Sequence, residues 1–313
     1  MSEPPHGLTE RQREIVTHRD GPLVVLGAAG TGKTYALGAR HAWLATEGGL
    51  EPEHVLALTH SVPAVDGLRA HVEAGIGHGF AELHVHTVLS PCAGRDMLPE
   101  AIVEAAFFNE INLIAITDHN AGYNAGPVMK VGRRQGLMVL PGMELETEEE
   151  IHSICLFDTL AQLRALQKIV DEKLPYFPNN EEFFGPQWVV DEKGKIIRTE
   201  KRQLLFPVQI SIQEACRIVT DLGGLFIPAH VNREAYGLLA RLGTVPPDLD
   251  VQILEIDRRI TKEAFFKRFP ELAGYRLIQS GDVHYLDGFL GANLFSAKNT
   301  SLKAIKEAIL NSC

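Results

Sequence analysis

The sequence has little cysteine, and its cysteines form no pairing pattern. There are four in 313 residues, far apart and without a Cys-x-x-Cys pair, at Cys92, Cys155, Cys216 and Cys313. Disulfide-rich secreted domains and zinc ribbons need closely spaced cysteines, so both classes are excluded. Dispersed cysteines fit a reducing compartment, and we expect a cytoplasmic protein.

Long apolar runs are missing as well. No run approaches the roughly 20 apolar residues that a membrane-spanning helix needs, and residues 1–16 lack the basic and apolar regions of a signal peptide. We therefore expect no membrane partner. The formal net charge of −10 disfavours binding of long nucleic acid by bulk phosphate neutralisation. A short nucleic acid stays open, because basic residues recur between Lys193 and Arg202, although acidic residues interrupt them.

What is present points to a globular protein with two unlike blocks. The composition, 45% hydrophobic and 22% charged, is typical of folded soluble domains, and 313 residues suffice for one large domain and a smaller module. Glycine is dense at residues 73–79, which is typical of a junction. We expect a first domain at residues 1–78 and a second at residues 79–313.

The first block carries a phosphate-binding loop. Residues 27–34 read GAAGTGKT and fit G-x-x-x-x-G-K-[ST], after an apolar segment expected to be a strand at 22–26 and before a helical run at 35–45. Glycines let backbone N–H groups approach phosphates, the lysine supplies charge, and the threonine hydroxyl can bind Mg²⁺. The pattern predicts a site for ATP with Mg²⁺ formed by Gly27, Gly30, Gly32, Lys33 and Thr34.

Around this loop the chain resembles the N-terminus of UvrD/Rep-type superfamily 1 helicases. The matching text is LTERQREIV at residues 8–16, then GAAGTGKT, then VLALTHS at 55–61. The resemblance implies that Gln12 takes the place of the adenine-reading glutamine. The later helicase motifs, including a Walker B carboxylate, do not follow, so we expect no helicase activity. ATP binding and a remnant that binds nothing are the two alternatives.

The second block has six histidines, each at or just beyond the end of a short apolar run and near a carboxylate or another histidine. They are His84, His86, His119, His152, His230 and His284. Neutral imidazole is the commonest transition-metal ligand, and strand ends present side chains to a common point. The pattern therefore predicts a polynuclear metal site.

Strand-like and helix-like runs alternate along this block, which predicts a parallel sheet with helical crossovers that closes into a barrel. Six ordered pieces carry a specific resemblance: HVH at 84–86, TDHN at 117–120, PGME at 141–144, His152, PAH at 228–230, and GDVH at 281–284. The block resembles the PHP (polymerase and histidinol phosphatase) family of metal-dependent phosphoesterases. The fold implied is α/β: a PHP-type distorted (β/α)7 barrel preceded by a partial P-loop α/β segment.

The resemblance also implies a ligand set for two or three divalent ions of zinc, manganese or iron. One ion is assigned to His84, His86, Glu144 and Asp282; Glu144 bridges to a second, held with His152 and His230; His119 and His284 hold a third. Either Cys92 or Asp96 completes the set, and we prefer Cys92, whose thiolate suits zinc or iron better than Mg²⁺. The alternative for Cys92 is a small apolar residue buried in a turn. Arg233 is either a contact for the substrate phosphate or a surface arginine.

The predicted activity is hydrolysis of a phosphate ester by a metal-bound hydroxide. The substrate is a phosphomonoester of a small metabolite or nucleotide, or a nucleic-acid end, and the residues do not decide which. Two alternatives stand beside it: an ATP-binding module in DNA metabolism with the barrel as an accessory, and a barrel that has lost activity. Aromatic residues at 175–188 either stack on a base or, as we expect, form a small core.

Overall fold

The computed structural model describes residues 8–19, 21–26, 33–46, 78–296 and 301–311. The chain divides into two compact units, Met1–His78 and Gly79–Cys313. None of the described helices combines the length and the apolar character needed to cross a membrane.

The first unit contains two described helices, α1 (Glu10–Thr17) and α2 (Lys33–Thr46). A capping box begins α1: the Thr9 hydroxyl accepts from the backbone N–H of Gln12, and the Gln12 side chain accepts from Thr9 N at 2.9 Å. Arg40 of α2 donates to backbone carbonyls in the last turn of α1, which have no partner within their own helix. The two helices are therefore joined by polar contacts at a helix end as well as by apolar packing.

The secondary structure expected around the phosphate-binding loop is found only in part. The helix expected at 35–45 is present within α2. Residues 22–26 are not a strand, and Val24 and Leu26 are 80% and 90% exposed. A strand needs a hydrogen-bonded neighbour, and no other described segment of this unit pairs with these residues. The candidate strand at 55–61 lies outside the described residues.

The second unit is built on a sheet with the order β10-β1-β2-β3-β4-β7, and β8 pairs with β9. The bounds are β1 His78–Val85, β2 Ile111–Ile116, β3 Met138–Glu146, β4 His152–Leu156, β7 Leu225–Pro228, β8 Ile253–Ile256, β9 Arg276–Gln279 and β10 Asn293–Ser296. Strands β1, β2 and β3 are parallel, and so are β8 and β9. β4 runs antiparallel to both β3 and β7.

Contacts between strand ends curl these strands into a barrel-like ring. Val283, beyond β9, forms a parallel bridge with Val85 of β1, and Val231 N donates to Glu255 O between β7 and β8 at 2.9 Å. The expected α/β barrel class is confirmed. The expectation of a wholly parallel sheet is wrong at β4, because residues 147–151 between β3 and β4 are too few for a crossover helix.

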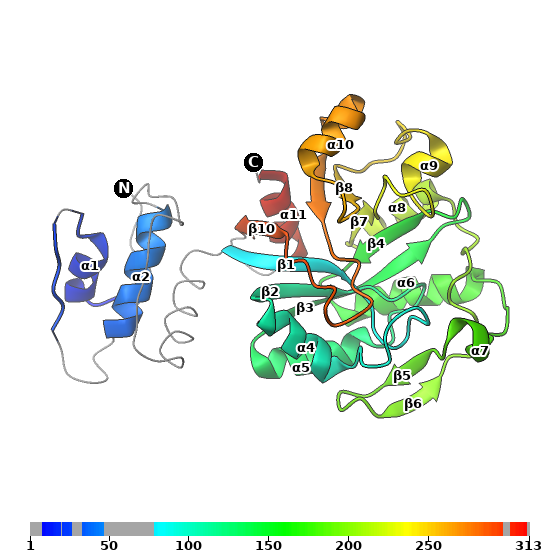
Figure 1. Ribbon diagram of the computed structural model, residues 1–313, viewed down its shortest axis with the longest axis horizontal. Coiled ribbons are helices and arrows are strands. Elements are labelled where there is room, and N and C mark those ends of the chain that lie inside the picture. The colour runs from blue at the N-terminus through cyan, green and yellow to red at the C-terminus, as the bar shows by residue number, and fades with distance from the viewer. Residues whose placement is uncertain (1–7, 20, 27–32, 47–77, 297–300, 312–313) are drawn as a thin grey trace. The chain divides into compact units, whose positions relative to one another are not determined.

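Helices cover the outer face of the ring: α4 packs against β2, α5 and α6 against β3, and α8 against β7 (Figure 1). Their bounds are α4 Pro99–Phe108, α5 Ala125–Gln135, α6 Leu160–Lys173 and α8 Ile212–Asp221. In α6 the buried residues are Leu163, Leu166, Gln167 and Val170, the spacing of one helix face. Between α6 and α8 lie α7 (Glu181–Phe184) and the hairpin of β5 (Trp188–Val190) and β6 (Ile196–Thr199). The loops after β7 and β8 carry α9 (Leu238–Leu242) and α10 (Lys262–Arg268), the latter followed by a short 3-10 turn.

The last helix, α11 (Leu302–Asn311), closes one end of the ring. Its apolar side joins a cluster with inward strand residues such as Leu83 and Ile227. The Asp158 carboxylate, just after β4, accepts from Leu302 N at 2.6 Å, and Arg276, at the start of β9, donates to Leu310 O at 2.9 Å. Because β4 ends and β9 begins there, α11 lies opposite the strand ends that carry the histidines.

Replacing Ile305 of α11, which is 1% exposed, with alanine should lower the free energy of unfolding. We expect a loss of about 2–5 kcal/mol, because the removed methylene and methyl groups leave a cavity. Lys303→Ala is the matched control, since Lys303 is exposed in the same helix, and should change stability by less than about 0.5 kcal/mol. Urea unfolding followed by circular dichroism measures both, and equal effects would contradict the packing of α11 described above.

Candidate metal centre

The six histidines converge on one end of the ring. His84 and His86 are at the end of β1, His119 follows β2, His230 follows β7, and His284 follows β9. His152 is instead the first residue of β4, but β4 is antiparallel and His152 pairs in register with Glu146 at the end of β3. The expectation that every histidine ends its strand is therefore wrong for His152, and its reversed strand brings it to the same rim.

Glu144, within β3, is the centre of the cluster. One carboxylate oxygen, Oε1, lies 3.2 Å from His84 Nε2, 2.8 Å from His152 Nδ1 and 3.2 Å from His230 Nε2. The other, Oε2, lies 3.3 Å from His86 Nε2 and 3.0 Å from His119 Nδ1. A single carboxylate thus contacts five imidazoles while only 1% exposed.

Asp282 is the second carboxylate of the cluster, and its Oδ1 lies 3.3 Å from Nε2 of both His84 and His86. Among the described residues, three groups have candidate ligand atoms within 4.8 Å of one another: His84, His86, Glu144 and Asp282; His119, Glu144 and His152; and His86, His119 and His284. The structure thus brings together eight of the nine residues of the sequence-based ligand set, with His230 placed by its contact with Glu144.

Cys92, the ninth residue of that set, lies beside His119 on an exposed turn and belongs to none of these three groups of described residues. Asp96, the alternative, is exposed and its carboxylate lies close to Gly94. Cys92 thus lies beside one residue of the cluster, His119. Unlike the other eight residues, it is not among the side chains that the structure brings together around Glu144 and Asp282.

The donor set fits divalent cations. His84 Nε2, His86 Nε2, Glu144 Oε2 and Asp282 Oδ1 are buried and, among the described residues, have no hydrogen-bond partner. Buried polar atoms rarely lack partners, and each of these four lies 3.3 Å from at least one of the others. Nitrogen and carboxylate ligands around a shared point suit zinc, manganese or iron.

The electrostatics of the cluster favour added positive charge. Burial raises the pKa of Glu144, yet the surrounding histidines hold that pKa well below its usual range. Burial works against charge on His86 and His152, but their contacts with carboxylates raise the pKa of each to about 9. Burial and the neighbouring His86 lower the pKa of His284 to about 3. The carboxylates are therefore ionised, and positive charge on the neighbouring imidazoles stabilises them.

Backbone strain accompanies the turns that direct these side chains inward. Asn120, His230 and Asp282 have φ values of 47°, 30° and 50°, although none is glycine. Positive φ costs non-glycine residues on the order of 1–3 kcal/mol and tends to occur at functional sites. The loops after β2, β7 and β9 each hold one such residue beside the cluster.

Two acidic residues that the sequence interpretation missed orient side chains of the cluster: Glu255 contacts histidines, and Asp257 holds Arg233. Glu255 of β8 is buried, and its Oε2 lies 3.0 Å from His84 Nδ1 and accepts from His230 N at 3.1 Å. Asp257, just after β8, accepts from Arg233 Nε at 2.5 Å. A carboxylate within the apolar run ILEI at 253–256 was the available sequence signal for Glu255. Holding Nδ1 of His84 leaves Nε2 directed at the cluster.

A third orienting contact runs through Asp118. Its carboxylate accepts from Thr87 N and from the Ser90 hydroxyl, both at 2.7 Å, and the Ser90 oxygen lies 2.9 Å from His86 Nδ1. Asp118 is fully buried and belongs to none of the candidate ligand groups of the described residues. It therefore fixes the ring of His86 through Ser90.

Arg233 lies at the cluster but is paired with protein carboxylates. Its Nη1 donates to Asp282 Oδ2 at 2.5 Å, beside its contact with Asp257. Burial lowers the pKa of the guanidinium, but these two carboxylates raise it above its usual value. Of the two sequence-based interpretations, the structure does not place Arg233 as a free surface arginine.

The candidate nucleotide residues of the first unit are described only in part. Gln12 engages the capping box of α1, and Lys33 begins α2 and lines a hollow of about 330 Å³ together with Leu23 and Arg40. Gly27, Gly30 and Gly32 lie outside the described residues, as does the side chain of Thr34. A helix N-terminus beside this lysine is the arrangement that a phosphate-binding loop requires.

Comparison with known proteins shows a helicase family for residues 8–204, which include most of the first block and part of the second. A family model, the UvrD/REP helicase N-terminal domain, matches residues 8–204. The chain belongs to the UvrD/REP helicase N-terminal domain family. The helicase PcrA of Bacillus subtilis is 36% identical over 86 residues, 28% of this chain and 12% of PcrA. UvrD1 of Mycobacterium tuberculosis is 34% identical over 86 residues, 28% of this chain and 11% of that helicase. The chain thus spans about an eighth of these members of the UvrD/REP family.

Solved structures resemble the larger part of the chain. The lesion-specific endonuclease EndoQ of Pyrococcus furiosus superposes with a TM-score of 0.55 and 17% identity, over 74% of this chain and 56% of that one. Endonuclease Q in complex with a 27-mer duplex carrying an abasic lesion at the active site gives a TM-score of 0.54 at 17% identity, over 75% of this chain and 57% of that one. Identity this low establishes a shared fold alone.

Glu255→Gln should weaken metal binding while keeping the size of the side chain. Residues that orient a ligating histidine typically contribute about 10–100-fold in metal affinity, because loss of the charge frees the ring to turn. Competition between the protein and a chromophoric chelator for Mn²⁺ or Zn²⁺ measures the change. Glu263→Gln, at an exposed position in α10, is the control and should bind metal as the wild type does. Unchanged affinity in Glu255→Gln would show that Glu255 does not position His84.

Proposed function

We propose that the second unit is a metal-dependent phosphodiesterase that acts on DNA. One observation carries this proposal: a buried glutamate, Glu144, contacts five histidines, and its neighbour Asp282 contacts two of them. Several ion positions can share such a set of ligands, and clusters of divalent ions suit phosphate-ester hydrolysis.

The chain's own residues have distinct parts in this proposal. His84, His86, Glu144 and Asp282 would hold one ion, and Glu144 would share in a second group of ligands with His119 and His152. Bound divalent ions lower the pKa of water, hold phosphate oxygens and neutralise charge on the leaving oxygen. Asp257 and Asp282 hold Arg233 in place through its Nε and Nη1 atoms. Its remaining nitrogen, Nη2, would donate a hydrogen bond to a phosphate oxygen of the substrate.

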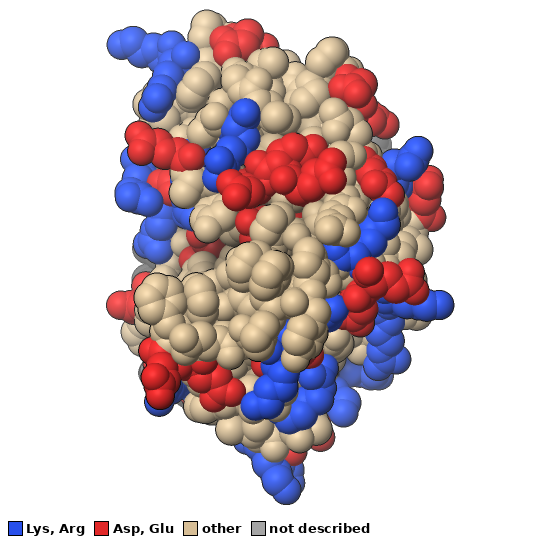
Figure 2. Space-filling model, turned by 90° about the vertical axis from the view of Figure 1, so that its right-hand side faces the viewer, with Lys and Arg blue, Asp and Glu red and all other residues tan. Residues whose placement is uncertain are grey.

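The surface beside the cluster supports a nucleic-acid substrate. The aromatic side chains of the insertion, expected to form a small core, do so in part: Trp188 packs against the core and Phe177 stacks on Phe206, but Tyr176 and Phe183 are 71% and 78% exposed. The turn that ends α7 adjoins the segment before Cys92, because a Cβ on Gly185 would lie 2.8 Å from Pro91 O. Figure 2 shows a broad uncharged region between acidic and basic side chains on the face toward which β1 and β2 run. Exposed aromatic rings stack on unpaired bases and show little preference for one base over another.

Two further findings favour DNA over a small metabolite. The chain belongs to a helicase N-terminal domain family whose model matches residues 8–204, and its larger part resembles in fold an endonuclease solved with a duplex that carries an abasic lesion. A phosphatase acting on a small molecule would need neither the helicase-type block nor the exposed rings.

Wild-type protein reconstituted with Mn²⁺ should cleave duplex or single-stranded DNA, and Asp282→Ala should slow cleavage by at least about a hundredfold. The loss of one carboxylate removes an ion's ligand and leaves His84 and His86 without it. Gel-resolved cleavage of labelled oligonucleotides measures the rate. Asp287→Ala is the matched control, because Asp287 is exposed five residues away. Equal rates for wild type and Asp282→Ala would refute the proposal, and cleavage of phosphomonoesters alone would replace DNA by a small substrate.

A second candidate function, ATP binding by the first unit, rests on the family match and on the position of Lys33 at the start of α2. Lys33→Ala should weaken binding of ATP with Mg²⁺ at least about tenfold, because it removes the charge that faces the phosphates. Calorimetry on the full chain measures the affinity, with the exposed Arg11→Ala as control. Negligible affinity in wild type and variant alike would mean that this block is a remnant.

A further inference from the structure

A cavity of about 470 Å³ lies on the outer wall of the ring, between α5, α6 and the β5–β6 hairpin. It is separate from the candidate metal centre. Asn120, next to His119, donates to Leu204 O and Phe206 O at 2.8 and 2.9 Å, so residues 204–206 are tied across the loop after β2. The cavity begins at Gly122 and Tyr123, beyond this contact.

Basic side chains outnumber acidic ones in the cavity wall. Lys130 comes from α5, Arg164 and Lys168 from α6, and Arg198 from β6; Asp171 is the acidic residue in the wall. Asp171 is already neutralised, because it pairs with Arg202 at 2.5 Å and lies 3.2 Å from the Tyr123 hydroxyl. Within the described part of the chain, no carboxylate pairs with Arg164 or Lys168. Arg198 pairs with Glu200 and Lys130 with Glu192, so the uncompensated positive charge comes from Arg164 and Lys168, and it favours an anion.

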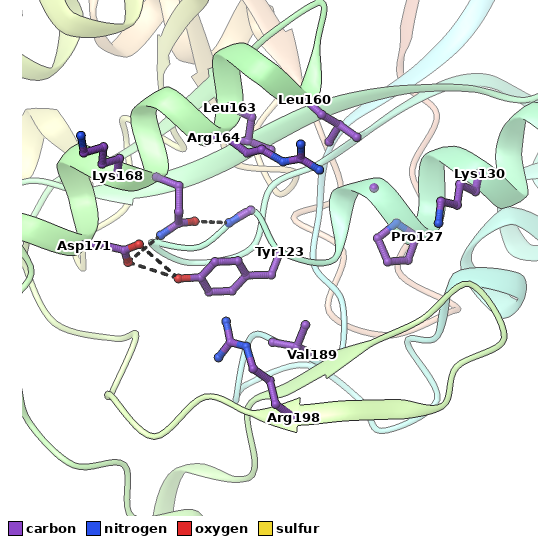
Figure 3. A pocket seen from close by; sticks show the side chains of 13 residues that line it. Tyr123, Pro127, Lys130, Leu160, Leu163, Arg164, Lys168, Asp171, Val189 and Arg198 are labelled. Atoms are coloured by element: carbon purple, nitrogen blue, oxygen red, sulfur yellow. Dashed lines mark hydrogen bonds between the residues drawn. The ribbon is translucent and has the colours of Figure 1, made fainter.

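The rest of the wall is flat and apolar. Figure 3 shows Leu160, Leu163 and Arg164 on one side of the space, and Tyr123 and Pro127 on the other. The Arg198 guanidinium lies 4.5 Å from the centroid of the Tyr123 ring, the stacked arrangement that planar cations adopt on aromatic rings. A second planar aromatic group can pack beside this pair through the same stacking interaction.

We propose that this cavity binds a nucleoside monophosphate. The phosphate is held by Arg164, Lys168 and Lys130, and the base lies against Tyr123 and the leucines of α6. The volume falls within the range of about 300–1,000 Å³ that small-molecule sites occupy, and walls on three sides suit a small ligand better than a continuous strand. The Lys130 pair with Glu192, at 3.4 Å between largely exposed groups, costs little to open.

The site adjoins the loop that holds His119. Gln167, in the cavity wall, accepts from Gly122 N at 2.7 Å, and Asn120 N donates to Glu144 O at 2.9 Å. A ligand in the cavity therefore contacts the segment three and four residues beyond His119 without touching a candidate metal ligand.

Calorimetric titration of AMP into the full chain tests the proposal. The protein carries Lys33→Ala and is treated with chelator, so that neither the phosphate-binding loop nor the metal centre contributes. We expect one saturable site per chain, with AMP binding more tightly than ribose 5-phosphate because the base adds contacts. Arg164→Ala should weaken AMP binding about tenfold, which corresponds to ~1.4 kcal/mol. Arg164 is exposed, so this change should leave folding intact.

Two further variants sharpen the result. Tyr123→Ala should weaken AMP binding but leave inorganic phosphate binding unchanged. Lys193→Ala, at an exposed hairpin position outside the cavity wall, is the matched control and should bind as the parent does. The proposal is overturned by an absence of saturation up to about 1 mM AMP, or by equal affinities of the parent and Arg164→Ala. It is overturned equally if a short oligonucleotide binds in place of AMP and Arg164→Ala abolishes that binding.

Discussion

A buried carboxylate surrounded by imidazoles is the constraint on which the second unit depends. Burying an ionised group without compensation is very costly, and Glu144 is ionised in a site from which water is nearly excluded. Five histidines contact it, and a second carboxylate, Asp282, contacts two of those. Such an arrangement is stable when cations balance the negative charge of the buried carboxylates. Divalent ions at the proposed positions would supply that positive charge.

The architecture follows from the need to bring these groups together. The ring of strands supplies convergent ends, and the short connection before β4 reverses that strand so that its first residue meets the end of β3. Three residues beside the cluster accept unfavourable φ values, while α11 closes the opposite end with an apolar face. Stability is thus provided at one end of the ring, and strain is concentrated at the other, where the candidate chemistry lies.

The sequence predicts the candidate metal ligands better than it predicts the residues that orient them. The convergence of the histidines could be expected from their places at strand ends, whereas Glu144 and Asp282 were identified through the resemblance to the PHP family. A supporting role for Asp118 follows from its place beside His119 on an extended segment, but the contact of Glu255 with His84 joins distant parts of the chain, and no local pattern reports it. The sequence did not show that the strand beginning at His152 is antiparallel, because periodicity does not reveal the direction in which a strand runs. The aromatic residues near α7 were expected to form a small core. Whether each ring is buried depends on which residues the insertion packs against, and the sequence does not show these neighbours.

Anomalous X-ray diffraction from crystals of the protein reconstituted with Mn²⁺ tests the central claim most directly. The account predicts at least two anomalous peaks within coordination distance of the Glu144 carboxylate, one of them also bound by His84, His86 and Asp282. Crystals of fully reconstituted protein with no anomalous peak at Glu144 would contradict it.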